Sequence, residues 1–278
     1  MLETVYIARH GFRLNWVTSN WQPITGTPRD PPLAAYGITQ AEELAKYFVS
    51  LPEDRRPTAI FSSPFYRCLQ TATPVAKALG LPLFVEHGIM EWYSPAKPGT
   101  GLHPRPGTAA SLKAFFPELD VSYGSTWLPT RLGETPEQVQ KRTDDFLEAF
   151  ASRLESTDHP GRHTKILFVG HAASCITLIK SLAGSNANGK SLRIGCCSLT
   201  TMKREAGKDK AAVLGAYEIV GRVAEASFLT NGAEREWGFE DISIDETGKV
   251  VDDPGEPGTE NEVEENVGLQ ILPPSARM

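Results

Sequence analysis

Residues 4–11 read TVYIARHG and residues 165–171 read KILFVGH, and these two stretches decide the fold. Each is a short run of apolar and β-branched residues, which is typical of a strand buried in the middle of a sheet. The first run leads to His10 and the second to His171. Because ligands of parallel sheets bind just beyond the carboxyl ends of the strands, we expect both imidazoles at one functional edge.

The segments around these two strands alternate between helix and strand patterns. Apolar residues at helical spacing, bounded by proline or glycine, predict helices at 37–51, 64–80, 134–154 and 172–182. Apolar runs predict further strands at 58–63, 83–86, 194–202 and 211–220. This alternation predicts an α/β fold, a three-layer αβα arrangement with a mostly parallel central sheet and helices on both faces.

The stretch 95–132 interrupts the alternation, since it holds six prolines and several glycines. We interpret it as an insertion within a domain of residues 1–244, and we expect it to cap the functional edge and select the substrate. A solvated Pro/Gly loop is the alternative. The side chains that it offers for contact with a substrate are Lys97, His103, Arg105, Trp127 and Arg131.

The last residues, 245–278, form an acidic tail. They hold nine acids and two bases, which leaves 25 acids and 26 bases in the rest of the chain. Their richness in Pro, Gly, Asp and Glu predicts a mobile segment, with an apolar patch at 269–272 that offers an anchor for a partner. The net charge of −6 excludes a broad basic surface, so we expect no direct contact with nucleic acid.

Cysteines and apolar runs indicate the compartment. The four cysteines form no C-x-x-C pair, which favours buried thiols in a reducing environment. The first residues carry no signal-peptide pattern, and the longest apolar stretch, 166–179, is too short to span a bilayer. We therefore expect a soluble, intracellular protein without a membrane partner.

The residues at the predicted edge suit a phosphate group. Arg9 lies at the end of the first strand, Arg67 lies in the first turn of the helix after the second strand, and Arg13 follows Arg9 closely. Guanidinium groups match phosphate oxygens in pairs and stay charged at every useful pH. Helix N-termini near Phe65 and Ala172 add donors that favour an anion.

The histidines and one carboxylate complete a set for phosphoryl transfer. A neutral imidazole can attack phosphorus, and a second imidazole can donate to the phosphoryl oxygens. Glu91, after the third strand, is the best placed proton donor for the leaving oxygen. That role needs a raised pKa, for which Trp92 and Tyr93 offer apolar surroundings.

Each of these residues also has a structural interpretation. A lone histidine at a strand end is more often a hydrogen-bonding residue than a nucleophile, and only the convergence of four such residues favours catalysis. Glu134, Glu137 and Arg142 fit an ordinary helix surface. The other histidines fit surface or packing positions, and no metal pair is indicated: His87, His103, His159 and His163. Serine-hydrolase, P-loop and dinucleotide motifs do not occur.

Together these motifs resemble the histidine phosphatase superfamily, also called phosphoglycerate mutase-like. The resemblance rests on Arg9-His10-Gly11, SSPFYRCLQTA around Arg67, Glu91 and VGHAAS around His171, with DPPLAAYGITQA and GETPEQVQKR in the family's order. It implies a phosphohistidine intermediate on His10, phosphate held by Arg9, Arg13, Arg67 and His171, Glu91 as proton donor, and neither metal nor cofactor.

A narrower resemblance is to the tau 55-type subunits of the fungal RNA polymerase III factor TFIIIC, which carry a histidine phosphatase domain. It rests on IARHGFRLNW, GIMEWY, the GCCSL strand and FLTNGAEREWGFE. It implies a nuclear phosphatase with other TFIIIC subunits as partners and a phosphoprotein or small phosphoester as substrate. The alternatives are an assembly subunit with residual activity and a cytoplasmic small-molecule phosphatase or mutase. Arg13-Leu14-Asn15-Trp16 departs from the mutase pattern, which favours hydrolysis.

Overall fold

The computed structural model describes residues 1–155, 163–187, 189, 191–243 and 253–270. A six-stranded sheet lies at its centre, in the order β3-β2-β5-β1-β6-β7. The four parallel strands are β1 (Thr4–Arg9), β2 (Ala59–Ser62), β3 (Leu83–Val85) and β5 (Lys165–Gly170). The antiparallel strands are β6 (Leu199–Arg204) and β7 (Tyr217–Glu225). The mostly parallel sheet confirms the predicted fold class.

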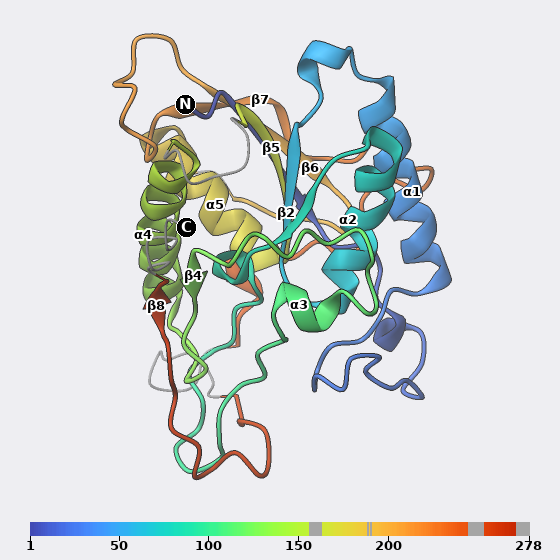
Figure 1. Ribbon diagram of the computed structural model, residues 1–278, viewed down its shortest axis with the longest axis vertical. Coiled ribbons are helices and arrows are strands. Elements are labelled where there is room, and N and C mark those ends of the chain that lie inside the picture. Colours follow the sequence, from blue (N-terminus) through green and yellow to red (C-terminus); the bar gives the residue numbers. More distant parts are fainter. Residues whose placement is uncertain (156–162, 188, 190, 244–252, 271–278) are drawn as a thin grey trace, which may run out of the picture.

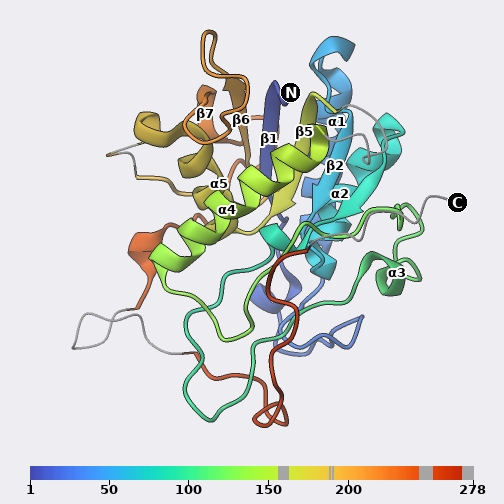
Figure 2. The same cartoon turned by 60° about the vertical axis from the view of Figure 1, so that its left-hand side comes forward.

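Helices cover both faces of the sheet (Figure 1). On one face lie α1 (Ala35–Ser50) and α2 (Tyr66–Leu79), and on the other lie α4 (Pro136–Glu155) and α5 (Ala172–Ala183). Figure 2 shows α4 running across the front of the second face. Each face has its own buried core, with Phe48 and Leu69 on the α1–α2 side and Phe146 and Ile179 on the α4–α5 side.

The loop after β1 touches α1 closely at two glycines. A Cβ atom on Gly11 would lie 2.7 Å from the Gly37 carbonyl oxygen, and one on Gly37 would lie 2.2 Å from that of Phe12. Neither position has room for a side chain. The two glycines therefore let α1 pack directly against the residues that follow His10. This close contact fixes the imidazole at the carboxyl edge of the sheet.

Two predicted strands begin later than expected. The stretch 194–202 is extended only from Leu199, because a turn at Gly195–Ser198 precedes it: Ser198 N donates to Gly195 O, and Cys197 has a left-handed φ of 53°. The stretch 211–220 is a strand only from Tyr217, and Gly215 before it has a φ of 64°. Both turns redirect the chain in ways that apolar spacing alone does not reveal.

The expectation of a mobile tail is wrong for residues 253–270. This segment packs along the insertion, and β8 (Gly268–Leu269) pairs antiparallel with β4 (Trp127–Leu128). Ion pairs join the two: Arg105 with Glu264 and Arg131 with Glu262. We call residues 95–132 and 253–270 the insertion–tail lobe; it also contains the one-turn helix α3 (Ala109–Leu112).

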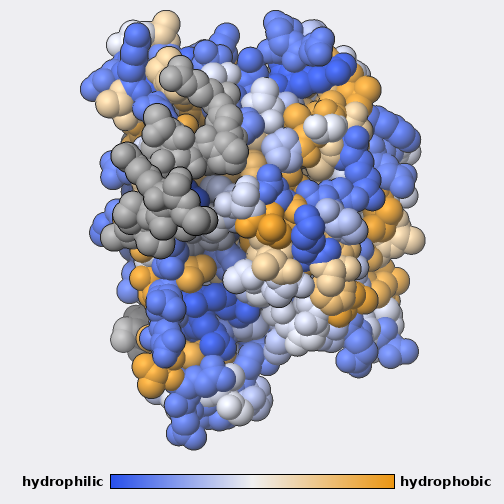
Figure 3. Space-filling view, viewed as in Figure 1, coloured by the Kyte–Doolittle hydropathy of each residue, from blue (hydrophilic) through white to orange (hydrophobic). Residues whose placement is uncertain are grey.

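On the face seen in Figure 3, the lobe reaches the lower left of the molecule, where apolar patches interrupt a hydrophilic surface. Arg29, from the loop before α1, adds ion pairs to Asp253 and Glu256. The acidic tail is therefore held by Arg29 of the body as well as by arginines of the insertion. Residues 245–252 and 271–278, which complete the predicted tail and the end of its apolar patch, lie outside the described residues.

All four cysteines, Cys68, Cys175, Cys196 and Cys197, are buried and free. Their burial agrees with the packing role expected of these thiols. Among the described residues, no helix combines the length and the apolar character needed to cross a bilayer.

Candidate active site

The carboxyl ends of β1 and β5 bring the two predicted histidines together. Arg9 and Gly170 are neighbours in the sheet register, so the residues that follow them emerge side by side. The ring centroids of His10 and His171 are 5.4 Å apart. Arg67, from the first turn of α2, lies with Nη2 3.2 Å from His171 Nδ1. The edge predicted from the strand ends therefore exists as a cluster of side chains.

His10 is placed to act as a neutral base or nucleophile. Its Nδ1 lies 2.8 Å from the Gly11 carbonyl oxygen. A carbonyl only accepts, so Nδ1 carries the proton and Nε2 keeps its lone pair. Burial and the nearby Arg67 and Arg9 guanidiniums hold the pKa of His10 well below its ordinary value. The imidazole is therefore unprotonated at neutral pH and available for bond formation.

Arg67 is the central cation, although only 1% of its side chain is exposed. Its Nη1 donates to Asp30 Oδ1 at 3.0 Å and its Nη2 to Glu91 Oε2 at 3.1 Å. Asp30 is fully buried and also accepts from Tyr66 N. Burial raises the pKa of Asp30, while Arg67 opposes that rise. The site was predicted without Asp30, although the DPPLAAYGITQA motif that contains it was noted.

His171 is fully buried and bonded on both ring nitrogens. Its Nε2 lies 2.8 Å from Ser63 Oγ, and its Nδ1 lies 3.2 Å from Glu91 Oε2. Burial lowers the pKa of His171 to about 4, against the opposing charge of Glu91. The ring is therefore neutral at pH 7 in the absence of an anion. Ser63 is a second partner that the sequence did not single out.

Glu91 differs from its expected state. Burial raises its pKa, but His171, Arg67 and Arg13 outweigh that effect and bring the pKa below its ordinary value. Since His171 is neutral near pH 7, the guanidiniums supply the lasting part of the shift. The apolar contribution expected from Trp92 and Tyr93 is thus overridden by charge. Glu91 is ionised when no anion occupies the site.

Arg9 and Arg13 flank His10 in different ways. Arg9 Nη1 donates to Ile194 O at 2.7 Å and also to Arg235 O. Arg13 lies over the Trp16 ring at 4.2 Å, and burial with the neighbouring Arg67 lowers its pKa to about 10. The Nε atoms of Arg9, Arg13 and Arg67 are buried without a hydrogen-bond partner. The three cations therefore retain donor capacity that an anion can use.

A cavity of about 240 Å³ opens over His10. Its described lining residues are Arg9, His10, Arg13, Glu91, Trp92, Ala172, Ala173 and Trp237. His10, Glu91 and His171 also offer ligand atoms within 4.8 Å of one another, as a metal site would. The surrounding guanidiniums repel a cation and attract an anion, so the donor set fits phosphate better than a metal ion.

The insertion does not supply the wall of this cavity. His103 Nε2 bonds to Ser94 O, while Arg105 and Arg131 bind the tail. Trp237, far along the chain, lines the cavity instead. Its position was not predicted, although it lies in the FLTNGAEREWGFE stretch that the resemblance included. Of the side chains that the insertion offers, Arg105 and Arg131 pair with the tail, whereas Lys97 is exposed to solvent.

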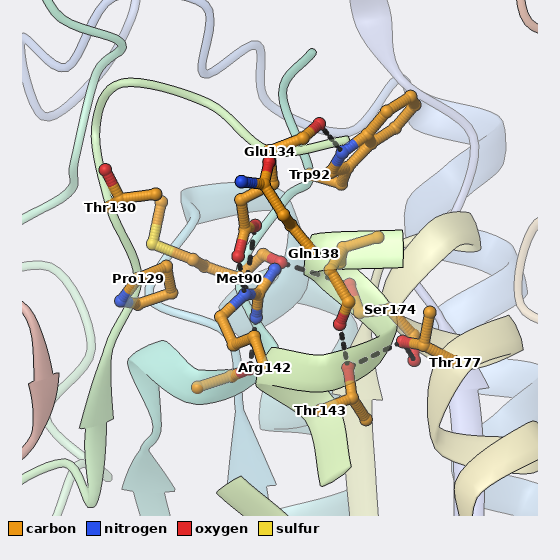
Figure 4. A network of polar contacts seen from close by, with 12 residues as sticks. Met90, Trp92, Pro129, Thr130, Glu134, Gln138, Arg142, Thr143, Ser174 and Thr177 are labelled. Carbon is orange, nitrogen blue, oxygen red and sulfur yellow. Dashed lines mark hydrogen bonds and ion pairs between the residues drawn. The ribbon is translucent and has the colours of Figure 1, made fainter. Parts of the chain in front are cut away.

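A buried network fixes the residues on both sides of Glu91 (Figure 4). Ser174 Oγ donates to Met90 O at 3.1 Å, and Trp92 Nε1 donates to Glu134 O at 2.7 Å. Arg142 Nε binds the Glu134 carboxylate at 2.7 Å, and both side chains are buried. The helix-surface interpretation of Glu134 and Arg142 is therefore wrong, and the pair positions the Glu91 loop. Glu137 is exposed, as that interpretation expected.

Comparison with known proteins agrees with this geometry. Residues 5–216 match the profile of the histidine phosphatase superfamily (branch 1). The chain belongs to this superfamily. A solved member of similar fold is the ecdysone phosphate phosphatase from Bombix mori in complex with tungstate. It has 18% sequence identity and a TM-score of 0.58, covering 79% of this chain and 92% of that chain.

Two curated relatives are similar to this chain in sequence. The transcription factor tau 55 kDa subunit of Saccharomyces cerevisiae is 43% identical over 210 residues, which is 72% of this chain and 47% of that protein. The ecdysteroid-phosphate phosphatase of Drosophila melanogaster is 25% identical over 243 residues, 73% of this chain and 31% of that protein. The matched regions are thus less than half the length of either relative.

Proposed function

We propose that this chain is a metal-independent phosphomonoester hydrolase that acts through a phosphohistidine on His10. The observation that carries the proposal is the state of His10, a neutral imidazole with its Nε2 lone pair free and Nδ1 held by the Gly11 carbonyl. Three guanidiniums and His171 surround it. Positioning and positive charge of this kind supply most of the catalysis of phosphoryl transfer.

In the first step, His10 Nε2 attacks phosphorus, a P–N bond forms, and the P–O bond to the leaving group breaks. Arg9, Arg13 and Arg67 hold the phosphoryl oxygens, and His171 donates to them. The leaving oxygen takes a proton from Glu91. The incoming phosphate brings negative charge beside Glu91 and competes for Arg67, and both effects raise the pKa of that carboxyl. Glu91 thus becomes an acid only when the substrate is bound.

In the second step, Glu91 returns as a base. It removes a proton from water, the water oxygen attacks phosphorus, and the P–N bond breaks to release inorganic phosphate and neutral His10. The net reaction of the two steps is the hydrolysis of one phosphomonoester to an alcohol and inorganic phosphate. The anchored neighbours of Glu91, Met90 and Trp92, keep the carboxyl at the same place for both proton transfers.

The test is hydrolysis of p-nitrophenyl phosphate in the presence of a metal chelator. We expect turnover by the wild-type chain and a loss of at least about 10⁴-fold in His10→Ala, as for other catalytic nucleophiles. Acid-labile phosphate should be trapped on the wild type but not on the variant. His163→Ala, at the far end of the sheet, serves as a matched histidine control. Turnover that survives His10→Ala contradicts the assignment.

A second function is favoured by the 43% identity to the tau 55 kDa subunit. We propose that the chain also assembles with TFIIIC subunits in the nucleus, with the catalytic site active or residual. Affinity purification of the tagged protein from its own cells should recover those subunits, in wild type and His10→Ala alike. Recovery of none of them contradicts the assembly role. A substrate panel that includes phosphoglycerates tests the remaining alternative of a metabolic phosphatase or mutase.

A further inference from the structure

The cavity over His10 has an aromatic wall, and one of its two tryptophans lies beyond the family match. That match ends at residue 216, whereas Trp237 lines the cavity. Trp92 forms the neighbouring part of the wall, and the two ring centroids are 6.3 Å apart with planes inclined at 47°. The base of the cavity is charged and this side is apolar. The two parts therefore suit different halves of one substrate.

The tryptophan from the later segment is firmly placed. Trp237 exchanges backbone hydrogen bonds with Ile194, and Cys196 N donates to Glu234 O at 2.9 Å. Phe239 contacts both tryptophans, with centroids 5.3 Å from Trp237 and 5.6 Å from Trp92. An aromatic ring that is held by backbone bonds and by two other rings loses little freedom when it binds a ligand.

Trp92 is fixed from the opposite side. Its Nε1 donates to Glu134 O, and the Glu134 carboxylate is bound in turn by Arg142, as Figure 4 shows. Its indole therefore has its polar atom satisfied within the protein and offers the cavity an apolar surface. Such a surface favours a ring over a polar or branched aliphatic group.

The size of the cavity limits where that ring can be. About 240 Å³ is below the ~300–1,000 Å³ of typical ligand pockets. With the phosphoryl group beside His10 and the arginines, the atoms next to the bridging oxygen already lie against the side of the cavity that Trp92 and Trp237 line. A flat ring must therefore be joined directly to the phosphate oxygen to use this wall.

We propose that Trp237, together with Trp92, is a specificity-determining residue that selects aryl phosphates, in which a flat ring carries the phosphate. This deepens the proposed function and rests on it. The shared chemistry covers a phosphotyrosine side chain and a small aryl phosphate. It disfavours alkyl phosphates such as phosphoserine, whose polar backbone would lie against the indoles.

Binding measured without turnover tests the proposal separately from the hydrolase activity. Phenylphosphonate and cyclohexylphosphonate differ in ring flatness but carry the same anion, and neither is hydrolysed. Calorimetry should show that the wild type binds phenylphosphonate about two- to tenfold more tightly, which is the scale of an aromatic contact. Trp237→Leu should remove this preference, and Trp237→Phe should keep most of it.

Two controls distinguish a direct contact between Trp237 and the ligand from an indirect, structural role of Trp237. Inorganic phosphate should bind Trp237→Leu within about twofold of wild type, because it contacts only the base of the cavity. Phe115→Leu, a partly exposed ring in the insertion, should leave both phosphonate affinities unchanged. An equal loss of affinity for all three anions in Trp237→Leu, or an unchanged phenyl preference, overturns the proposal, since Trp237 would then act through Arg9 or not at all.

Turnover then distinguishes the two sources of an aryl phosphate. The ratio of kcat/KM for phenyl phosphate to that for cyclohexyl phosphate should fall about two- to tenfold in Trp237→Leu relative to wild type. Intrinsic reactivity cancels in that comparison. A phosphotyrosine peptide that outperforms phenyl phosphate indicates a protein substrate, and the reverse indicates a small molecule. Absence of all turnover refutes the proposed function, while the phosphonate preference still decides this inference.

Discussion

The active-site edge and the insertion–tail lobe are both held by arginine–carboxylate pairs, yet their pairs lie in different surroundings. At the edge, Arg67 is 1% exposed and binds Asp30 at 0%. In the lobe, Arg131 is 22% exposed and binds Glu262 at 49%. Buried ions are costly to desolvate and very costly to leave unpaired, whereas each exposed pair contributes little. At the edge, buried guanidiniums provide positive charge for binding an anion. In the lobe, several weak ion pairs together hold the tail against the insertion.

Loss of the buried cation should give the largest effect. Arg67→Met leaves Asp30 and Glu91 without their partner, so we expect the free energy of unfolding to fall by about 3–5 kcal/mol. We also expect kcat/KM to fall by about 10²–10³-fold, as for other lost transition-state donors. Urea denaturation and steady-state kinetics measure the two quantities.

Arg131→Met is the matched control in the lobe. It should change the free energy of unfolding by about 1 kcal/mol or less and leave kcat/KM within about twofold. Arg67→Lys should retain more stability than Arg67→Met but little of the activity, since lysine lacks the fork that binds two partners. Similar losses in the Arg67→Met and Arg131→Met variants would contradict the contrast between the regions.

Acid should weaken both regions through buried histidines. Burial lowers the pKa of His171, at the edge, and of His87, bonded to insertion residues, to about 4 in each case. The unfolded chain takes up these protons near pH 6.5, but the folded chain does not until about pH 4. The free energy of unfolding should therefore fall as the pH drops through this window. Each histidine contributes up to about 1.4 kcal/mol per pH unit to this fall.

Binding of an anion should change the pKa of only one of the two histidines. Bound inorganic phosphate favours the protonated form of His171, so its pKa should rise, whereas that of His87 should not move. Imidazole resonances followed by NMR across pH 4–7 measure both values. His87→Asn, which removes one titrating group, should reduce the pH dependence of unfolding without changing the phosphate response. If phosphate shifts the pKa of His87 instead of that of His171, the proposed position of the anion site is wrong.

Breaking the best-buried pair of the lobe should have a much smaller effect than the loss of Arg67. Glu264 is 12% exposed and pairs with Arg105, accepting also from Thr130 Oγ1 at 2.6 Å and from Arg131 N. Glu264→Gln should lower the melting temperature by about 2–4 °C and speed proteolysis of the tail, with kcat/KM within about twofold. Glu137→Gln, exposed on α4, is the control. A large loss of activity in Glu264→Gln would mean that the lobe belongs to the active site.

The sequence predicted those features that local patterns determine. Strand ends at His10 and His171 followed from apolar runs, and Arg67 followed from its place in a helix start. Pairing across long separations was not visible: Arg67 meets Asp30 from 37 residues away, and Arg9 meets Arg235 from 226 residues away. The ionised state of Glu91 likewise depends on Arg13 and Arg67, which come from two other segments of the chain.

The acidic tail shows the same limit of sequence-based prediction, because its partners also lie far away in the chain. Its acidic composition predicted mobility because no partner is visible within the segment. The partners are Arg29, Arg105 and Arg131, which lie far earlier in the chain. Composition reports the charge of a segment, but the fold decides whether opposite charges face it.

The position of β1 in the sheet has a consequence for biosynthesis. This strand leaves the ribosome well before its sheet neighbours β5 and β6, which begin at Lys165 and Leu199. At ~5–20 residues per second, the nascent chain keeps this apolar segment without its partners for on the order of ten to thirty seconds. Chaperones that hold unpaired strands during translation should therefore associate with the growing polypeptide until β5 emerges.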